Sequence, residues 1–293
     1  PATVYCSPMS TVAAAVAKTL AEAGITRVFG LPGGEVLVLI DELRKAGVDF
    51  VLMRHEANAG LAASVYGKLK RQPGVVIATL GPGAANLMLP IASAYLDQEP
   101  LLAITAQLPD EFPPSHTHQL LPLHESFRPM CRVVDRITQA NAGEVVSRAL
   151  AGAMSRPYGV SYLTLSAREA VKPQTMIGPK WSEGHSTRPL ANPASRAADL
   201  RAKCAMATRP LVLLGLGINT RNADKIRRWI DEWQLPVAVT PKVKGIVDET
   251  SPNFVGVISG MAADGLMVDA LNASDLRIGF GLDPVEVDKL WHA

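Results

Sequence analysis

The chain has 293 residues, of which 48% are hydrophobic, and its formal net charge is +2 at pH 7. This length and apolar content are sufficient for two ordinary globular domains, each with a core of its own. Basic residues never run longer than a pair such as Arg227-Arg228, so the composition argues against nucleic-acid binding. No stretch of roughly 18 or more apolar residues runs uninterrupted, which argues against a membrane span.

The cysteines Cys6, Cys131 and Cys204 stand without metal-like spacing, and three of them cannot all pair. We therefore interpret them as reduced thiols of a cytoplasmic protein, and we expect no metal site from them. The alanine-rich stretch near the N-terminus lacks the basic start and continuous apolar core of a signal peptide. This also favours a cytoplasmic location.

Apolar runs of strand length alternate with segments of helical period in the first part of the chain, which is typical of a parallel sheet with helices on both faces. The predicted helices span 10–23, 35–46, the stretch from just after Glu56 to Lys70, 84–96 and 143–155. The predicted strands span 27–29, 50–53, 75–79, 101–105 and 160–165. Residues 109–129 carry prolines and histidines without a period, which predicts a long irregular connection.

A second unit of the same class follows a linker. Residues 172–193 hold four prolines, two glycines and no apolar period, so we expect domains at 1–171 and 194–293. In the second domain a helix precedes the next elements, which are a strand at 211–214, a helix at 222–233 and strands at 237–240 and 277–280. The fold class predicted for both domains is therefore α/β, with two doubly wound parallel sheets.

The turn after the strand 211–214 has two of the three glycines of a dinucleotide fingerprint. Gly215 and Gly217 match it, and Thr220 stands where the third glycine would be. Two interpretations stay open: a nucleotide site, as in a nicotinamide dehydrogenase, or an ordinary tight turn. The dehydrogenase interpretation lacks an obvious acid at the end of the next strand.

Three junctions between a predicted strand and a predicted helix carry unusual residues. They are Leu31–Glu35, Arg54–Glu56 and Thr79–Asn86. A carboxylate such as Glu56, placed where a strand delivers the chain into the interior, suggests chemistry, although the helix dipole also favours an acid in a first turn. The combination of the three junctions favours a functional site.

These motifs resemble a known family. In this order and at this spacing they look like the pyrimidine-binding domain of thiamine-diphosphate enzymes of the acetolactate synthase type. The resemblance covers about the first 170 residues and is specific because several motifs recur together. The motifs that carry it are Gly30–Gly34, Arg54–Glu56, Ala78–Asn86, Ala94–Asp97 and Pro100–Thr105. Residues 210–217, 236–245 and 279–284 resemble the family's Rossmann-like central domain more loosely.

The resemblance implies a role for Glu56. Thiamine diphosphate works after losing a proton from C2 of its thiazolium ring, and a carboxylate at N1′ of its pyrimidine favours the tautomer that removes this proton. The resemblance further implies that Gln119 and His118 meet the substrate, a 2-keto acid such as pyruvate. His118 departs from the aromatic residue usual there. The residues expected to line the cofactor are Gly33, Gly34, Thr79, Gly81, Gly83 and Asn86.

The resemblance also implies groups that this chain does not contain. Family members bind Mg²⁺ and the diphosphate through a further domain with a Gly-Asp-Gly motif, and no Gly-Asp-Gly occurs here. We therefore expect a diphosphate-binding domain from a continuing or separate chain, a homo-oligomer, and no activity from the isolated chain. Flavin is not expected, because residues 281–286 lack the arginine-containing segment of flavin-binding relatives.

The function that the resemblance implies is that of a transferase or lyase, which decarboxylates 2-keto acids and forms carbon-carbon bonds. The alternative is a non-catalytic assembly or nucleotide-sensing module with a vestigial cofactor site. A serine hydrolase is disfavoured because no Gly-x-Ser-x-Gly sequence occurs. His116, His118 and His124 could imitate a metal cluster, but their spacing does not support one.

Overall fold

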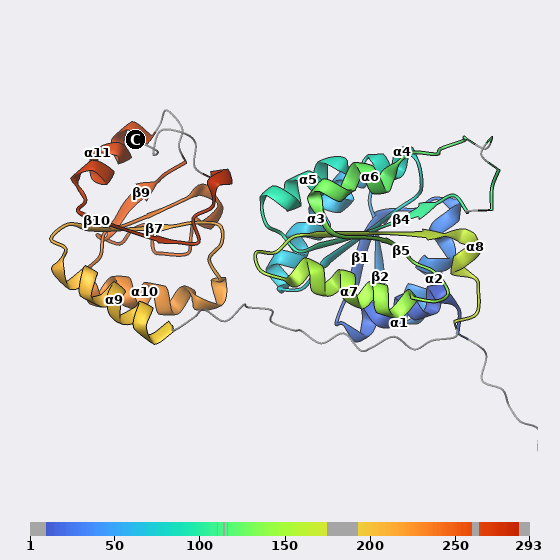
Figure 1. The fold of residues 1–293 in the computed structure, drawn as a ribbon, viewed down its shortest axis with the longest axis horizontal. Coiled ribbons are helices and arrows are strands. Elements are labelled where there is room, and N and C mark those ends of the chain that lie inside the picture. The colour runs from blue at the N-terminus through green and yellow to red at the C-terminus, as the bar shows by residue number, and fades with distance from the viewer. Residues whose placement is uncertain are drawn as a thin grey trace, which may run out of the picture. The chain divides into compact units, whose positions relative to one another are not determined.

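The computed structural model describes residues 10–174 except 110, 114 and 116, together with residues 193–259 and 264–286. The chain divides into two compact units, Pro1–Thr187 and Arg188–Ala293 (Figure 1). Most of the predicted linker, residues 175–192, lies outside the described residues. The predicted domain limits therefore stay predictions.

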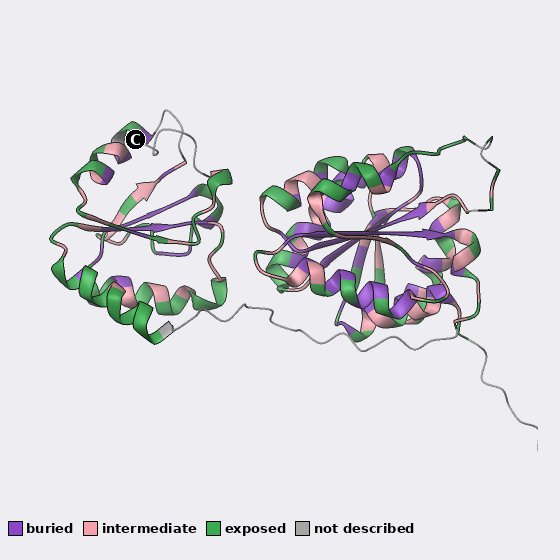
Figure 2. Cartoon of the chain, viewed as in Figure 1, coloured by how far each residue is buried: buried purple, intermediate pink, exposed green. Residues whose placement is uncertain are grey.

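The first unit is built on a six-stranded sheet in the order β2-β1-β3-β4-β6-β5, with every pair parallel. The strands are β1 (Arg27–Leu31), β2 (Asp49–Leu52), β3 (Gly74–Ala78), β4 (Leu101–Gln107), β5 (Cys131–Arg136) and β6 (Val160–Ser166). The strands β3 and β6 are buried along their whole length (Figure 2). Continuous burial is typical of parallel strands that are covered on both faces.

Helices cover both faces of this sheet (Figure 1). On one face lie α1 (Val12–Glu22), α2 (Leu37–Lys45) and α7 (Ala142–Met154). On the other face lie α3 (Glu56–Lys70), α4 (Pro82–Ala85), α5 (Met88–Leu96) and α6 (Leu123–Phe127). Short helical turns complete the unit: η1 (Gly34–Val36), η2 (Arg128–Met130) and α8 (Ala167–Ala170).

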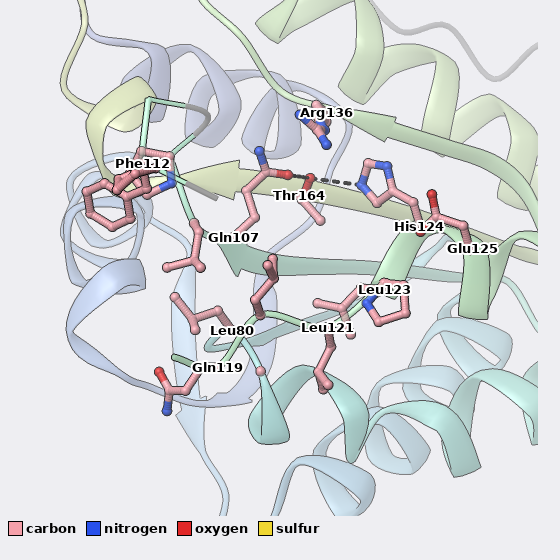
Figure 3. Close-up of a pocket in the computed structure, with 16 residues that line it drawn as sticks. Leu80, Gln107, Phe112, Gln119, Leu121, Leu123, His124, Glu125, Arg136 and Thr164 are labelled. Carbon is pink, nitrogen blue, oxygen red and sulfur yellow. Dashed lines mark hydrogen bonds between the residues drawn. The ribbon is translucent and has the colours of Figure 1, made fainter. Parts of the chain in front are cut away.

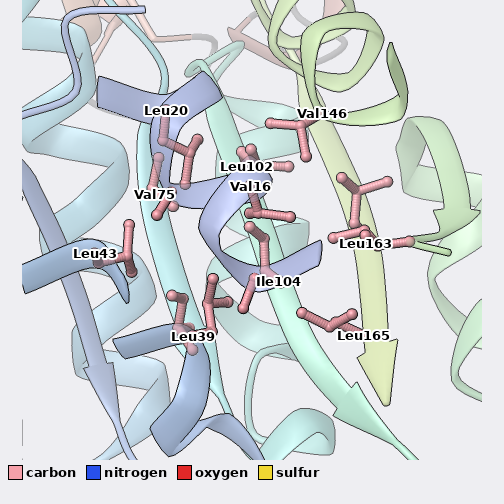
Figure 4. Close-up of a cluster of buried hydrophobic side chains, with 14 of the residues drawn as sticks. Val16, Leu20, Leu39, Leu43, Val75, Leu102, Ile104, Val146, Leu163 and Leu165 are labelled. Atoms are coloured by element: carbon pink, nitrogen blue, oxygen red, sulfur yellow. The ribbon is translucent and has the colours of Figure 1, made fainter. Parts of the chain in front are cut away.

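Alternate residues of the central strands serve two separate cores, because successive side chains of a strand point to opposite faces. Val75 and Ile77 of β3 belong to the core under α1, α2 and α7, which Figure 4 shows. Val76 and Ala78 belong to the core under α3, α5 and α6.

Some features of the first unit differ from the prediction. The connection predicted to be irregular over residues 109–129 contains the helix α6 and the start of the turn η2. The single helix predicted for 84–96 is wrong, because the chain forms α4 and then α5. Pro90 has no backbone N–H with which to bond the carbonyl of Asn86, so a new helix begins just before it. The strand β5 was not predicted. It lies at the edge of the sheet, and its exposed Arg132 and Arg136 interrupt the run of apolar residues that would indicate a strand.

The second unit has a four-stranded parallel sheet in the order β10-β7-β8-β9. The strands are β7 (Pro210–Leu214), β8 (Val237–Val239), β9 (Phe254–Val257) and β10 (Leu276–Phe280). The helices α9 (Pro193–Met206) and α10 (Ala223–Trp233) cover one face and α11 (Gly265–Ala273) the other (Figure 1). Short turns lie at η3 (Thr220–Asn222), η4 (Pro241–Val243) and η6 (Pro284–Glu286). The α/β class is confirmed in both units, although β9 and α11 were not predicted.

Candidate functional site

The predicted site lies where the strand order of the first sheet reverses. The strand β1 pairs with β2 on one side and with β3 on the other. In parallel α/β sheets, ligands bind outside the carboxyl ends of the strands at such a switch point. The turn at Gly33 follows β1, the segment that ends at Glu56 follows β2, and Thr79 follows β3. The three unusual junctions of the sequence therefore meet at one edge of the sheet.

Glu56 is the first residue of α3 and is only 6% exposed. The preceding residue, His55, caps the helix, because its Nδ1 accepts a hydrogen bond of 3.1 Å from the backbone N–H of Ala57. The side-chain amide of Asn86, which follows α4, donates to Oε2 of Glu56 at 2.9 Å. The buried carboxylate at the start of α3 is thus bound by a side chain that lies 30 residues further along the sequence.

Two glycines, which have no Cβ atom, allow the backbone to lie close to Thr79 and Glu56. A Cβ added at Gly83 would lie 2.6 Å from Cγ2 of Thr79 and 3.1 Å from Oε1 of Glu56. A Cβ added at Gly33 would overlap Oγ1 of Thr79. Real Cβ atoms essentially never lie within 3.0 Å of another heavy atom, so a side chain at either position would require Thr79 to shift. A Cβ added at Gly34 would meet nothing within 4 Å.

Glu35 belongs to this group of residues, although the sequence reasoning gave it no role. Its Oε2 accepts a hydrogen bond of 2.7 Å from the hydroxyl of Thr79. The bond joins the turn after β1 to the end of β3. The only signal in the sequence was its position next to Gly33 and Gly34.

Gln119 lies against Gly81, at the edge of this group of residues. Gly81 has a positive φ of 61°, and a Cβ added there would lie 2.6 Å from the Cβ of Gln119. The side chains of Gln119 and His118 are both exposed, so their roles toward a substrate stay predictions. Of the predicted residues, Glu56, Asn86, Gly33, Thr79 and Gly83 form one contiguous group.

A cavity of about 330 Å³ adjoins Gly81 and Gln119 (Figure 3). Its wall carries a chain of hydrogen bonds in which Thr164 donates to Gln107 and the Nε2 of His124 lies 3.0 Å from the same threonine oxygen. Thr164 gives its only proton to Gln107, so His124 must donate through Nε2. Burial, followed by the charge of Arg136, lowers the pKa of His124.

This chain of polar side chains was not predicted from the sequence. Gln107 ends β4, and Thr164 is a polar residue within the fully buried strand β6. Thr164 alone offered a signal, since a buried hydroxyl needs a partner. His118 and His124 are described, whereas His116 lies outside the described residues. Within the described part of the chain, no group of three His, Cys, Asp or Glu side chains could hold a metal ion.

The two cysteines in the described part of the chain are free thiols, and burial disfavours their charged thiolate form. Burial raises the pKa of Cys131 to about 12 and also raises the pKa of Cys204. Cys6 lies outside the described residues. None of the helices in the described part of the chain has the length and apolar character needed to cross a membrane.

In the glycine turn of the second unit, a side chain of the same chain already binds a backbone amide. The carboxylate of Glu286 accepts a hydrogen bond of 2.6 Å from the backbone N–H of Leu216. A Cβ added at Gly215 would lie 2.6 Å from the carbonyl oxygen of Gly281. A dinucleotide diphosphate uses such turn amides, so it would have to displace Glu286. This geometry favours the interpretation of the turn as a tight βα connection.

Two family models match the chain. The model described as "Thiamine pyrophosphate enzyme, N-terminal TPP binding domain" matches residues 10–125. The model described as "Thiamine pyrophosphate enzyme, central domain" matches residues 198–291. The first match contains all three junctions around Glu56, and the second contains the turn at Gly215.

Several curated proteins named acetolactate synthase are similar in sequence. The one from Bacillus subtilis is 29% identical over 284 residues, which cover 94% of this chain and 49% of that protein. The large subunit from Corynebacterium glutamicum is 30% identical over 273 residues, 92% of this chain and 44% of that protein. The one from Mycobacterium bovis is 32% identical over 282 residues, with the same two shares of 92% and 44%. The chain therefore spans about half the length of the curated relatives it matches.

Proposed function

The chain belongs to the thiamine pyrophosphate enzymes of the acetolactate synthase type, and from this premise we propose that its first unit binds the pyrimidine end of thiamine diphosphate. The observation that carries the proposal is the buried carboxylate of Glu56, held by Asn86 at the switch point of a parallel sheet. Oε2 is engaged by Asn86, whereas Oε1 faces Gly83, where no Cβ intervenes. These residues fit a flat heterocycle that offers a ring nitrogen.

When bound in the proposed site, thiamine diphosphate would supply a thiazolium carbon that can act as a nucleophile toward a carbonyl group. Glu56 would hold a proton at N1′ of the aminopyrimidine, which would favour the tautomer that the chemistry at C2 requires. Asn86 fixes the direction of the Glu56 carboxyl group. The glycines at 33 and 83 let Thr79 and Glu56 approach the backbone.

We further propose that the complete protein acts on 2-keto acids such as pyruvate, by decarboxylation with formation of a carbon-carbon bond. Gln119 and His118 then meet the substrate from the segment beside Gly81. The support is that the relatives are named acetolactate synthase. The comparisons do not favour the non-catalytic alternative. The cytoplasmic location stays a prediction.

The diphosphate and Mg²⁺ are assigned in this proposal to a diphosphate-binding domain in a continuing or separate chain, within a homo-oligomer. The support is that residues 1–293 contain no Gly-Asp-Gly and that the 273 matched residues cover 44% of the Corynebacterium protein. Flavin is not part of the proposal, because residues 281–286 lack the expected arginine-containing segment.

The substitution Glu56→Gln tests the proposal. The amide keeps the size of the side chain and can still accept from Asn86, but it cannot share an acidic proton with N1′. We expect exchange of the C2 proton of thiamine diphosphate in the full-length protein, followed by NMR in deuterated water, to slow at least about 100-fold.

Glu99→Gln is the matched control. Glu99 is 7% exposed and forms an ion pair of 3.2 Å with Lys68. Lys68 lies in the last turn of α3, at the opposite end of this helix from Glu56. It therefore reports what the loss of a buried carboxylate does to the fold alone. We expect its exchange rate to stay within about twofold of the wild type. An unchanged exchange rate in Glu56→Gln would remove Glu56 from the proposed role.

A further inference from the structure

Glu35 lies beside the proposed cofactor site and is not explained by the proposed function. Its carboxylate accepts a hydrogen bond of 2.7 Å from the hydroxyl of Thr79. Glu35 lies in the turn η1 after β1, and Thr79 follows β3, so the bond spans 44 residues of sequence. A hydrogen bond to a carboxylate is stronger than one between neutral groups.

The side chain of Thr79 has two branches, and the two face different glycines. Its Oγ1 is the nearest atom to a Cβ added at Gly33, whereas its methyl carbon Cγ2 lies 2.6 Å from a Cβ added at Gly83. Oε1 of Glu56 lies 3.1 Å from that same added Cβ. The methyl group of Thr79 and the carboxylate of Glu56 therefore both lie beside Gly83. Threonine has only three staggered χ1 positions, and the positions differ in which branch faces which neighbour.

We propose that Glu35 is a positioning residue, which holds Thr79 in the rotamer that turns its methyl group toward Glu56 and its hydroxyl away. The hydroxyl has one proton to donate, and it donates to Glu35; in this proposal, a hydroxyl released from Glu35 would turn and donate to Glu56 instead. Because Glu35 accepts this hydrogen bond, Oε1 of Glu56 stays free of the Thr79 hydroxyl and available to the ring nitrogen of the cofactor. The inference rests on the proposed function for this last step only.

Gly33 makes the arrangement possible. A Cβ there would overlap Oγ1 of Thr79 and would lie 3.0 Å from Oε2 of Glu35. The hydrogen bond therefore occupies the space that a side chain at this position would fill. The Gly-Gly-Glu sequence at 33–35 and Thr79 act together, although one follows β1 and the other follows β3.

The test uses Glu35→Ala, Glu35→Gln, Thr79→Val and the double variant Glu35→Ala/Thr79→Val in the full-length protein. The first readout is χ1 of Thr79, from three-bond couplings to its labelled Cγ2 without cofactor. We expect one rotamer in the wild type and in Glu35→Gln, whose amide oxygen can still accept the hydroxyl proton. We expect a mixture of rotamers in Glu35→Ala.

The second readout is the exchange rate of the C2 proton. Glu35→Ala should slow exchange about tenfold, and Glu35→Gln should recover most of this loss. In the Thr79→Val background no hydroxyl can turn toward Glu56, so adding Glu35→Ala should change the rate less than about twofold. Circular dichroism checks that each variant is folded.

An unchanged χ1 in Glu35→Ala overturns the inference, and so does an equally large effect of Glu35→Ala in the Thr79→Val background. The failure of the proposed function looks different. If the wild-type protein does not bind thiamine diphosphate, the function fails while the rotamer measurement still decides whether Glu35 orients Thr79.

Discussion

At the scale of single residues, the site depends on contacts that leave no space for a Cβ. Gly33 and Gly83 flank Thr79, and Gly83 also lies against Glu56. Gly34 is different, because a Cβ added there would meet nothing within 4 Å. Two neighbouring glycines in one turn therefore serve different purposes. Gly33 allows a hydrogen bond between side chains to form beside the backbone, and Gly34 borders open space.

This difference predicts unequal effects of Gly33→Ala and Gly34→Ala. The backbone of Gly33 has an extended conformation that alanine also adopts, so the substitution acts through the clash with Thr79 and Glu35 alone. We expect Gly33→Ala to lower the free energy of unfolding by about 1–3 kcal/mol and Gly34→Ala to change it by less than about 0.5 kcal/mol. Urea unfolding of both variants measures this. Equal losses would show that the contact at Gly33 yields easily.

At the scale of elements, α3 and α5 bring together the two residues of the buried hydrogen bond. Glu56 begins α3, and Asn86 lies just before α5. The helices approach closely at Gly60, where an added Cβ would lie 2.5 Å from Cγ of Pro90. Pro90 thus has two effects: it breaks the helix after Asn86 and packs against the glycine of the neighbouring helix.

A double-mutant cycle tests this helix contact. Gly60→Ala should destabilise the protein by about 1–3 kcal/mol, because the added methyl group overlaps the proline ring. Pro90→Ala removes the ring, so the loss caused by Gly60→Ala should be smaller in the Pro90→Ala background. Thermal or urea unfolding of the four proteins provides the cycle. Strictly additive losses would mean that the two residues do not share this contact.

At the scale of the whole molecule, each of the two units carries its own sheet and its own apolar cores. The first unit extends to at least Gln174, because Val12 donates to the carbonyl of Lys172 at 2.9 Å and Gln174 donates to the carbonyl of Ser10 at 2.6 Å. These bonds join the last described residues of the unit to the start of α1. A chain that ended at residue 171, the predicted limit, would lack them, and the limit itself stays a prediction.

Two truncated chains test this closure. A chain that ends at Val171 loses the backbone bonds at 172–174, whereas one that ends at Gln174 keeps them. We expect the shorter chain to be less stable by about 1–2 kcal/mol, since each net hydrogen bond contributes roughly 1 kcal/mol. Thermal unfolding followed by circular dichroism compares them. Identical midpoints would mean that the pairing with residues 10–12 adds nothing.

The sequence by itself determined the α/β class, most of the strands and the three junctions at which functional residues gather. Those features are local. Apolar period, strand length and the presence of Gly or Pro depend on residues close together in the chain. The break before α5 was also legible in principle, because Pro90 stands in the middle of the predicted helix. The strand β5 was not, since its edge position leaves no continuous apolar run.

Only the tertiary structure decided which side chains meet. Asn86 reaches Glu56 across 30 residues, and Thr79 reaches Glu35 across 44, because the strand order sets β1 between β2 and β3. No local pattern encodes that order. It follows from how the helices bury the two faces of the sheet, so contacts between turns of different strands exist only once the whole unit has packed.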